Sequence, residues 1–123
     1  MKNYFSNNEL KCKCGCDVNK FNPDTLAKLN RLREDYGKPI IINSAYRCKN
    51  YNIKIGATQT HATGQAVDIS VDRKNAYRII PLIYRMGFTG LGIKQHGSGR
   101  FLHIDDLEEI LPKQPRPAIW SYK

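Results

Sequence analysis

The feature that most constrains the fold is a pair of segments, AVDISVD (66–72) and RFLHIDD (100–106), in which apolar and polar residues alternate. Alternation with a period of two is typical of a β-strand that has one face in the core and the other face open. The valines, isoleucines and leucines of both segments define the core faces. Asp68 and His103 are therefore expected on the opposite, more open face, and Asp105 shares the face of His103.

The other elements follow from similar patterns. Helices are expected over 22–36 and 73–86, further strands over 39–45 and 90–94, and a hairpin-like loop over 95–99. The run at 39–45 is apolar and β-branched, which predicts a buried strand. Pro81 must either kink the second helix or mark its true start. The C-terminal PRPAIWSYK predicts an irregular segment packed on the body of the protein. This order of elements predicts an α+β fold with a small, mostly antiparallel sheet flanked by helices.

Length and composition limit the remaining possibilities. The 123 residues, of which 41% are hydrophobic and 25% charged, predict a single soluble domain over 1–123. No window approaches the roughly 18 apolar residues of a membrane span, so no membrane partner is expected. The N-terminal MKNYFSNNELK lacks the apolar stretch of a secretory signal. We therefore expect synthesis in the cytoplasm, and any action outside the cell requires another exit route.

A formal net charge of +9 predicts attraction to polyanions. Nucleic acid is one candidate, and anionic cell-wall polymers or lipid headgroups fit equally well. The basic residues are spread along the chain, and no nucleic-acid-binding motif accompanies them. We therefore expect no nucleic-acid partner.

Four cysteines leave several possibilities open. Cys12, Cys14 and Cys16 lie in CKCGC, and Cys48 is remote in sequence. Reduced structural thiols are the expectation for a cytosolic product. The alternatives are a second metal ion or, if the protein works outside the cell, a disulfide. The CxCxC segment can look like a zinc site, but its spacing differs from that of the common CxxC pairs.

The open face of the two alternating strands suggests a metal site. His61 precedes the first strand by a loop that contains Gly64, which allows a tight turn. His61, Asp68 and His103 can thus converge, and two histidines with one carboxylate are the ligands of a catalytic zinc site with an open fourth position. The alternative is that each residue has an ordinary role, as a solvated histidine or a hydrogen-bonding aspartate.

Four segments together carry a family resemblance: SAYRCKNYN, HATGQAVDI, FLHID and RPAIWSY. In this order they resemble the zinc D-Ala-D-Ala carboxypeptidase and L-alanyl-D-glutamate peptidase family. That family includes VanX-type dipeptidases and phage endolysins, and it shares its fold with the hedgehog signalling domain. The resemblance extends from about residue 3 to residue 122.

The resemblance implies that His61, Asp68 and His103 hold one zinc ion per chain. It also implies that Arg47 binds the substrate carbonyl or carboxylate and stabilises the oxyanion. Many relatives have a serine at the position of Gln59, which leaves the substrate contact there open. Several have an acidic general base at the position of Arg100, and an arginine cannot serve as that base.

The general base must then lie elsewhere. We expect Asp105 to act either as this base or as a residue that orients a ligand histidine through its ring N–H. Asp106 and Glu108 are the alternative choices for the base. His96, in the loop at 95–99, is a candidate for binding the substrate or the transition state.

The implied substrate is a peptidoglycan stem peptide or muropeptide, cut at D-Ala-D-Ala or at L-Ala-D-Glu. A phage endolysin and a cytoplasmic peptidase that acts on wall fragments both fit, and we expect a monomer. The alternative function is a zinc-binding recognition domain of the same fold without catalysis.

Overall fold

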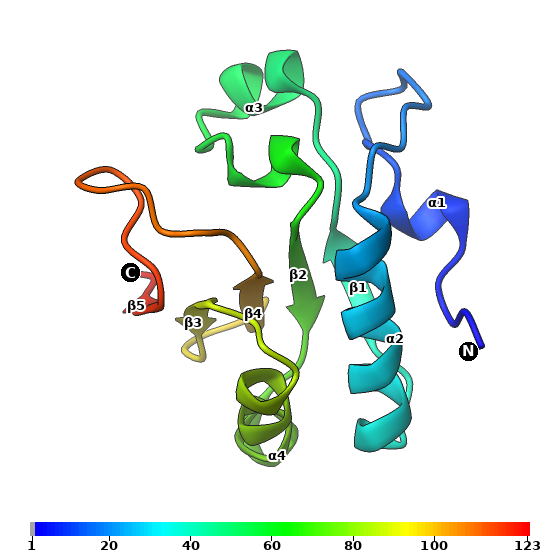
Figure 1. Ribbon diagram of the computed structural model, residues 1–123, viewed down its shortest axis with the longest axis vertical. Coiled ribbons are helices and arrows are strands. Elements are labelled where there is room, and N and C mark those ends of the chain that lie inside the picture. The colour runs from blue at the N-terminus through cyan, green and yellow to red at the C-terminus, as the bar shows by residue number, and fades with distance from the viewer. Residues whose placement is uncertain (1) are drawn as a thin grey trace.

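The computed structural model describes residues 2–123. Its centre is a five-stranded sheet with the order β1-β2-β4-β3-β5 (Figure 1). The strands are β1 (Ile41–Ser44), β2 (Ala66–Ser70), β3 (Gly90–Lys94), β4 (Phe101–Asp105) and β5 (Ala118–Ser121). Only β3 and β5 pair in parallel, and the other neighbours are antiparallel. The predicted α+β fold with a mostly antiparallel sheet is confirmed.

The helices are α1 (Asn7–Leu10), α2 (Pro23–Tyr36), α3 (Lys49–Ile55) and α4 (Arg73–Arg85), with a 3-10 turn η1 (Thr60–Thr63). Helix α2 begins and ends as the sequence predicts. The Asn22 side chain accepts hydrogen bonds from the first free N–H groups, and Gly37 ends the helix with a φ of 75°. The short α1 was not expected, although Ser6 and Glu9 form a capping box there.

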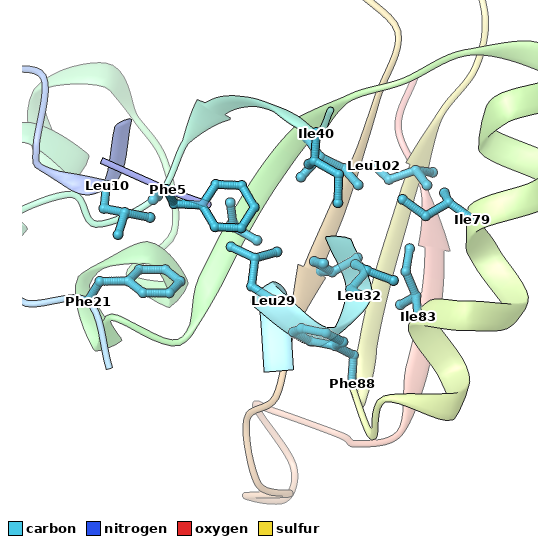
Figure 2. Close-up of a cluster of buried hydrophobic side chains, with 14 of the residues drawn as sticks. Phe5, Leu10, Phe21, Leu29, Leu32, Ile40, Ile79, Ile83, Phe88 and Leu102 are labelled. Atoms are coloured by element: carbon cyan, nitrogen blue, oxygen red, sulfur yellow. The ribbon is translucent and has the colours of Figure 1, made fainter. Parts of the chain in front are cut away.

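The hydrophobic core lies between one face of the sheet and the helices α2 and α4. Leu29 and Leu32 of α2 and Ile79 of α4 are fully buried (Figure 2). The apolar positions of the two alternating strands complete this core: Val67, Ile69, Leu102 and Ile104. The opposite face of the same strands is free to carry polar side chains, as the alternation predicts. Helix α3 and η1 lie beyond the start of β2, at one end of that open face (Figure 1).

Three details differ from the sequence-based expectation. Strand β1 is not buried but forms an edge of the sheet, because only β2 pairs with it, and Ile41 is 63% exposed. Pro81 does not start a helix, since α4 begins eight residues earlier at Arg73 and continues through the proline. The C-terminal segment is not wholly irregular, because β5 adds to β3 at the other edge. No helix within residues 2–123 is both long and apolar enough to cross a membrane.

Candidate functional site

Two paired strands and a 3-10 turn bring the three predicted zinc ligands together. Asp68 in β2 lies directly opposite His103 in β4 in the antiparallel register. His61 lies in η1, and Gly64 then turns the chain into β2 with a φ of 76°. One ligand atom from each residue lies within 4.8 Å of the others. A side chain at position 64 would collide with the Lys20 backbone, so the close contact between this turn and the segment at Lys20 requires glycine.

Each histidine uses one ring nitrogen to contact the protein and turns the other toward Asp68. His61 Nδ1 lies 2.7 Å from the carbonyl oxygen of Ala45, which can only accept a hydrogen bond, so Nδ1 carries the proton. His103 Nε2 lies 2.8 Å from a carboxylate oxygen of Asp105. In the neutral imidazoles, His61 Nε2 and His103 Nδ1 are therefore left with free lone pairs.

These two lone pairs converge on a third acceptor. His61 Nε2 and His103 Nδ1 lie 3.2 Å and 3.0 Å from Oδ1 of Asp68. His61 Nε2 is buried and makes no hydrogen bond with any described residue, so its short distance to Asp68 is not a hydrogen bond. Three electron-pair donors around one point repel one another unless a proton or a cation lies between them. The donor set fits zinc, which takes imidazole nitrogen and carboxylate oxygen.

The pKa shifts of Asp68 and His103 agree with a cation at this point. Burial raises the pKa of the Asp68 carboxyl, but the neighbouring His103 and His61 rings outweigh burial and hold that pKa well below its usual range. Burial lowers the pKa of His103, but Asp105 and Asp68 outweigh it and raise that pKa. The cluster thus favours a positive charge at its centre.

Asp105 lies behind His103, away from this centre. Its carboxylate is fully buried and accepts two hydrogen bonds from Arg116 in addition to the one from His103. Burial raises the pKa of Asp105, but His103 and Arg116 outweigh burial and lower it. Gly90, opposite Asp105 in the sheet, leaves the space for this carboxylate, because a Cβ there would lie 2.6 Å from Cγ of Asp105. This geometry favours the orienting role of Asp105 over the role of general base.

The cluster opens into a cleft of about 990 Å³. The predicted substrate residues Arg47 and Gln59 line it. Nε of Arg47 is buried and has no hydrogen-bond partner among the described residues. His96 is not among the described residues that line the cleft; it is exposed and lies 3.2 Å from the Tyr122 carbonyl oxygen. Its proposed role in binding the substrate stays a prediction without support from its position.

Three residues of the site were not singled out from the sequence: Arg116, Trp120 and Tyr122, all of which line the cleft. The Trp120 ring lies 5.3 Å from the His103 ring, centroid to centroid. Gly92 makes this possible, because a Cβ there would lie 2.8 Å from atoms of both aromatic rings. All three residues lie in the motif RPAIWSY, which carries part of the family resemblance. Their contacts with the site could not be predicted, because they depend on the pairing of β5 with β3.

The sequence model of the family described as Peptidase M15 matches residues 3–105. No curated protein and no solved structure matches the chain at a significant level. The family match covers most of the chain and includes all three residues of the metal cluster. The chain therefore belongs to the Peptidase M15 family of zinc-dependent metallopeptidases.

Proposed function

We propose that this protein hydrolyses a peptide bond in peptidoglycan stem peptides, at D-Ala-D-Ala or at L-Ala-D-Glu, with one catalytic zinc ion held by His61, Asp68 and His103. The observation that carries the proposal is the convergence of three lone-pair atoms on one point at the floor of a cleft. Three protein ligands leave a fourth zinc position for water or substrate, which is the arrangement of catalytic sites.

Zinc at this position would supply a Lewis acid that polarises the scissile carbonyl and makes water a stronger nucleophile near neutral pH. The residues of the chain would supply orientation and charge. Asp105, held by Arg116, keeps the proton of His103 on Nε2 and so keeps Nδ1 free for the metal. Ala45 does the same for His61 through its carbonyl oxygen.

Arg47 is the residue best placed to stabilise negative charge that develops on the substrate. Arg47 lines the cleft that also contains His61, and its Nε is buried with no hydrogen-bond partner in the described part of the chain. Because Nε itself is enclosed, the terminal Nη groups of the guanidinium are the donors that would reach a substrate carbonyl or carboxylate oxygen. Such a donor contributes most when it is fixed in position before the substrate binds.

The lining of the cleft supports an anionic peptide as substrate. Arg47, Lys113 and Arg116 contribute positive charge, and Trp120 and Tyr122 contribute aromatic rings. Stem peptides carry free carboxylates on D-Glu and at the C-terminus, which these cations would attract. Asp68 is the sole acidic residue among the described residues of the lining.

The decisive experiment is digestion of purified peptidoglycan and isolated muropeptides by the zinc-loaded protein, followed by mass spectrometry of the products. Loss of a terminal D-Ala would identify carboxypeptidase action, and release of peptides from the glycan at L-Ala would identify endopeptidase action. The His61→Ala variant should be inactive. Cleavage of other peptides with no cleavage of muropeptides would overturn the assigned substrate. Adding the protein to intact and to permeabilised bacterial cells would test whether it works as an endolysin on the assembled wall or on wall fragments in the cytoplasm.

The second candidate function is a zinc-binding recognition domain without catalysis. It is favoured by the lack of a free carboxylate among the described residues of the lining, since Asp68 is a predicted ligand and Asp105 is enclosed. Retention of muropeptides on the immobilised zinc-loaded protein, with no product formed, would support this second candidate.

A further inference from the structure

The four cysteines form a second cluster, separate from the site described above. The Sγ atoms of Cys12, Cys14, Cys16 and Cys48 lie within 4.8 Å of one another, and all four thiols are free. We propose that they bind a structural zinc ion as a closed four-thiolate site. Sites with four protein ligands and no open position are typical of zinc that stabilises a fold.

The local backbone explains how the CKCGC segment can supply three sulfurs to one point. Gly15 has a φ of 99° and Asp17 a φ of 59°, so the chain turns tightly between the second cysteine and Val18. The backbone N–H of Cys12 closes the turn by donating to the Val18 carbonyl at 2.9 Å. Three sulfurs spaced two residues apart thereby converge on one point. A helix would place them on different faces, and a strand would keep them on one face but about 7 Å apart from one to the next, too far for a single ion.

The distances suit a tetrahedral ion. A zinc–sulfur bond of about 2.3 Å in a tetrahedron places neighbouring sulfurs about 3.8 Å apart. The Cys14 and Cys48 sulfurs are 3.7 Å apart, across a sequence separation of 34 residues. A disulfide would require about 2.05 Å between two of the sulfurs and would leave the other two without a role.

Backbone N–H groups already point at two of the sulfurs. The Cys48 N–H donates to Cys12 Sγ at 3.3 Å, and the Tyr51 N–H donates to Cys48 Sγ at 3.4 Å. Donors directed at sulfur stabilise the thiolate form, which is the form that binds metal. Lys13 and Lys49 adjoin the cysteines along the chain and would offset part of the negative charge of four thiolates, whereas the adjacent Lys11 is paired with Asp17 at 2.7 Å.

The site would fasten the N-terminal segment to the wall of the cleft. Cys48 directly follows Arg47, whose backbone N–H donates to the His61 carbonyl at 3.2 Å. Beside it, the Tyr46 N–H donates to the Leu10 carbonyl at 3.0 Å. An ion held by Cys48 and by the loop at 12–16 would therefore fix the segment that carries Arg47 into the cleft.

The test measures zinc per chain in protein purified without added metal, together with the reactivity of its thiols. We expect two zinc ions in the wild type, loss of one in His61→Ala, and loss of the other in Cys16→Ser. Cys16→His, which replaces one zinc ligand by another, should keep both ions. Cobalt substituted into the wild type or into His61→Ala should show an intense thiolate-to-metal charge-transfer band.

The wild type alone also decides the question if a cysteine variant fails to fold. Titration with a mercurial reagent should release one zinc ion as the four thiols react, and alkylation of the native protein should be slow until a chelator removes the metal. One zinc ion in the wild type that is unaffected by the mercurial, or a disulfide found by mass spectrometry, would overturn the proposal. Iron in place of zinc would overturn the choice of metal, since four thiolates also suit iron.

Discussion

Arg116 holds Asp105 through two parallel hydrogen bonds, from Nε to Oδ1 at 2.9 Å and from Nη2 to Oδ2 at 2.8 Å. The Asp105 side chain is completely buried and the Arg116 side chain is 8% exposed. Planar, two-point pairing of this kind fixes both position and orientation of a carboxylate. Asp105 is thereby fixed against His103 Nε2, 2.8 Å away, and cannot turn toward the cleft without breaking the pair.

Removing Arg116 should destabilise the fold because it leaves a buried carboxylate without its cation. We expect Arg116→Met to lower the free energy of unfolding by about 3–5 kcal/mol. Urea denaturation followed by circular dichroism measures this difference. Arg116→Lys keeps the charge but not the two-point geometry and should fall between Met and the wild type. Equal stability of all three proteins would show that the pair contributes nothing.

Asp105→Asn should weaken zinc binding and so distinguish the two roles considered for Asp105. An amide holds the His103 N–H less strongly than a carboxylate, and loss of such an orienting partner typically lowers metal affinity about 10–100-fold. Competition with a chromogenic chelator measures the affinity. If zinc affinity is unchanged and hydrolysis is abolished, Asp105 is instead the general base.

The sequence predicted those elements whose signal is local. The alternation in β2 and β4 and the cap and stop signals of α2 were sufficient to place all three elements, because each signal depends on neighbours within a few residues. The exposure of β1 could not be predicted, since a β-branched run reads the same at an edge as in the centre of a sheet. The strand β5 was missed because its pairing with β3 bridges residues far apart in sequence.

In the candidate site too, some residues could be predicted from local sequence signals and others could not. His61, Asp68 and His103 could be chosen from strand faces and from the family motif, and the structure brings their ligand atoms together. The contact of Arg116 with Asp105 could not be predicted, because an eleven-residue separation through an irregular loop carries no periodicity. The burial of Asp105 and its two hydrogen bonds from Arg116 could therefore not be predicted either.

Gly92→Ala should disturb the site without changing any polar group. A Cβ at this position would lie 2.5 Å from Nε1 of Trp120 and 2.8 Å from the Tyr122 ring, so the rings must move away from His103. Overpacking of this kind costs about 1–3 kcal/mol of stability. Thermal denaturation and the rate of muropeptide hydrolysis measure the two effects.

A double-mutant cycle provides the control for Gly92. In the Trp120→Ala background the added methyl group meets one ring fewer, so Gly92→Ala should cost less stability there than in the wild type. An equal cost in both backgrounds would place the strain elsewhere in β3.

Arg47→Ala should reduce catalysis while leaving the catalytic zinc in place. Arg47 lines the cleft, and it is not among the residues of the metal cluster. Loss of one donor that stabilises a developing oxyanion lowers kcat about 10²–10³-fold. Steady-state hydrolysis of a muropeptide measures kcat, and metal analysis of the same samples measures the zinc content.

Two further variants make the Arg47 result specific. Lys54→Ala removes an equal charge from the exposed part of α3 and should leave kcat unchanged. Arg47→Lys retains the charge but lacks the planar set of donors, so it should recover only part of the lost activity. An increase in KM with unchanged kcat for Arg47→Ala would contradict oxyanion stabilisation and assign Arg47 to ground-state binding of a substrate carboxylate.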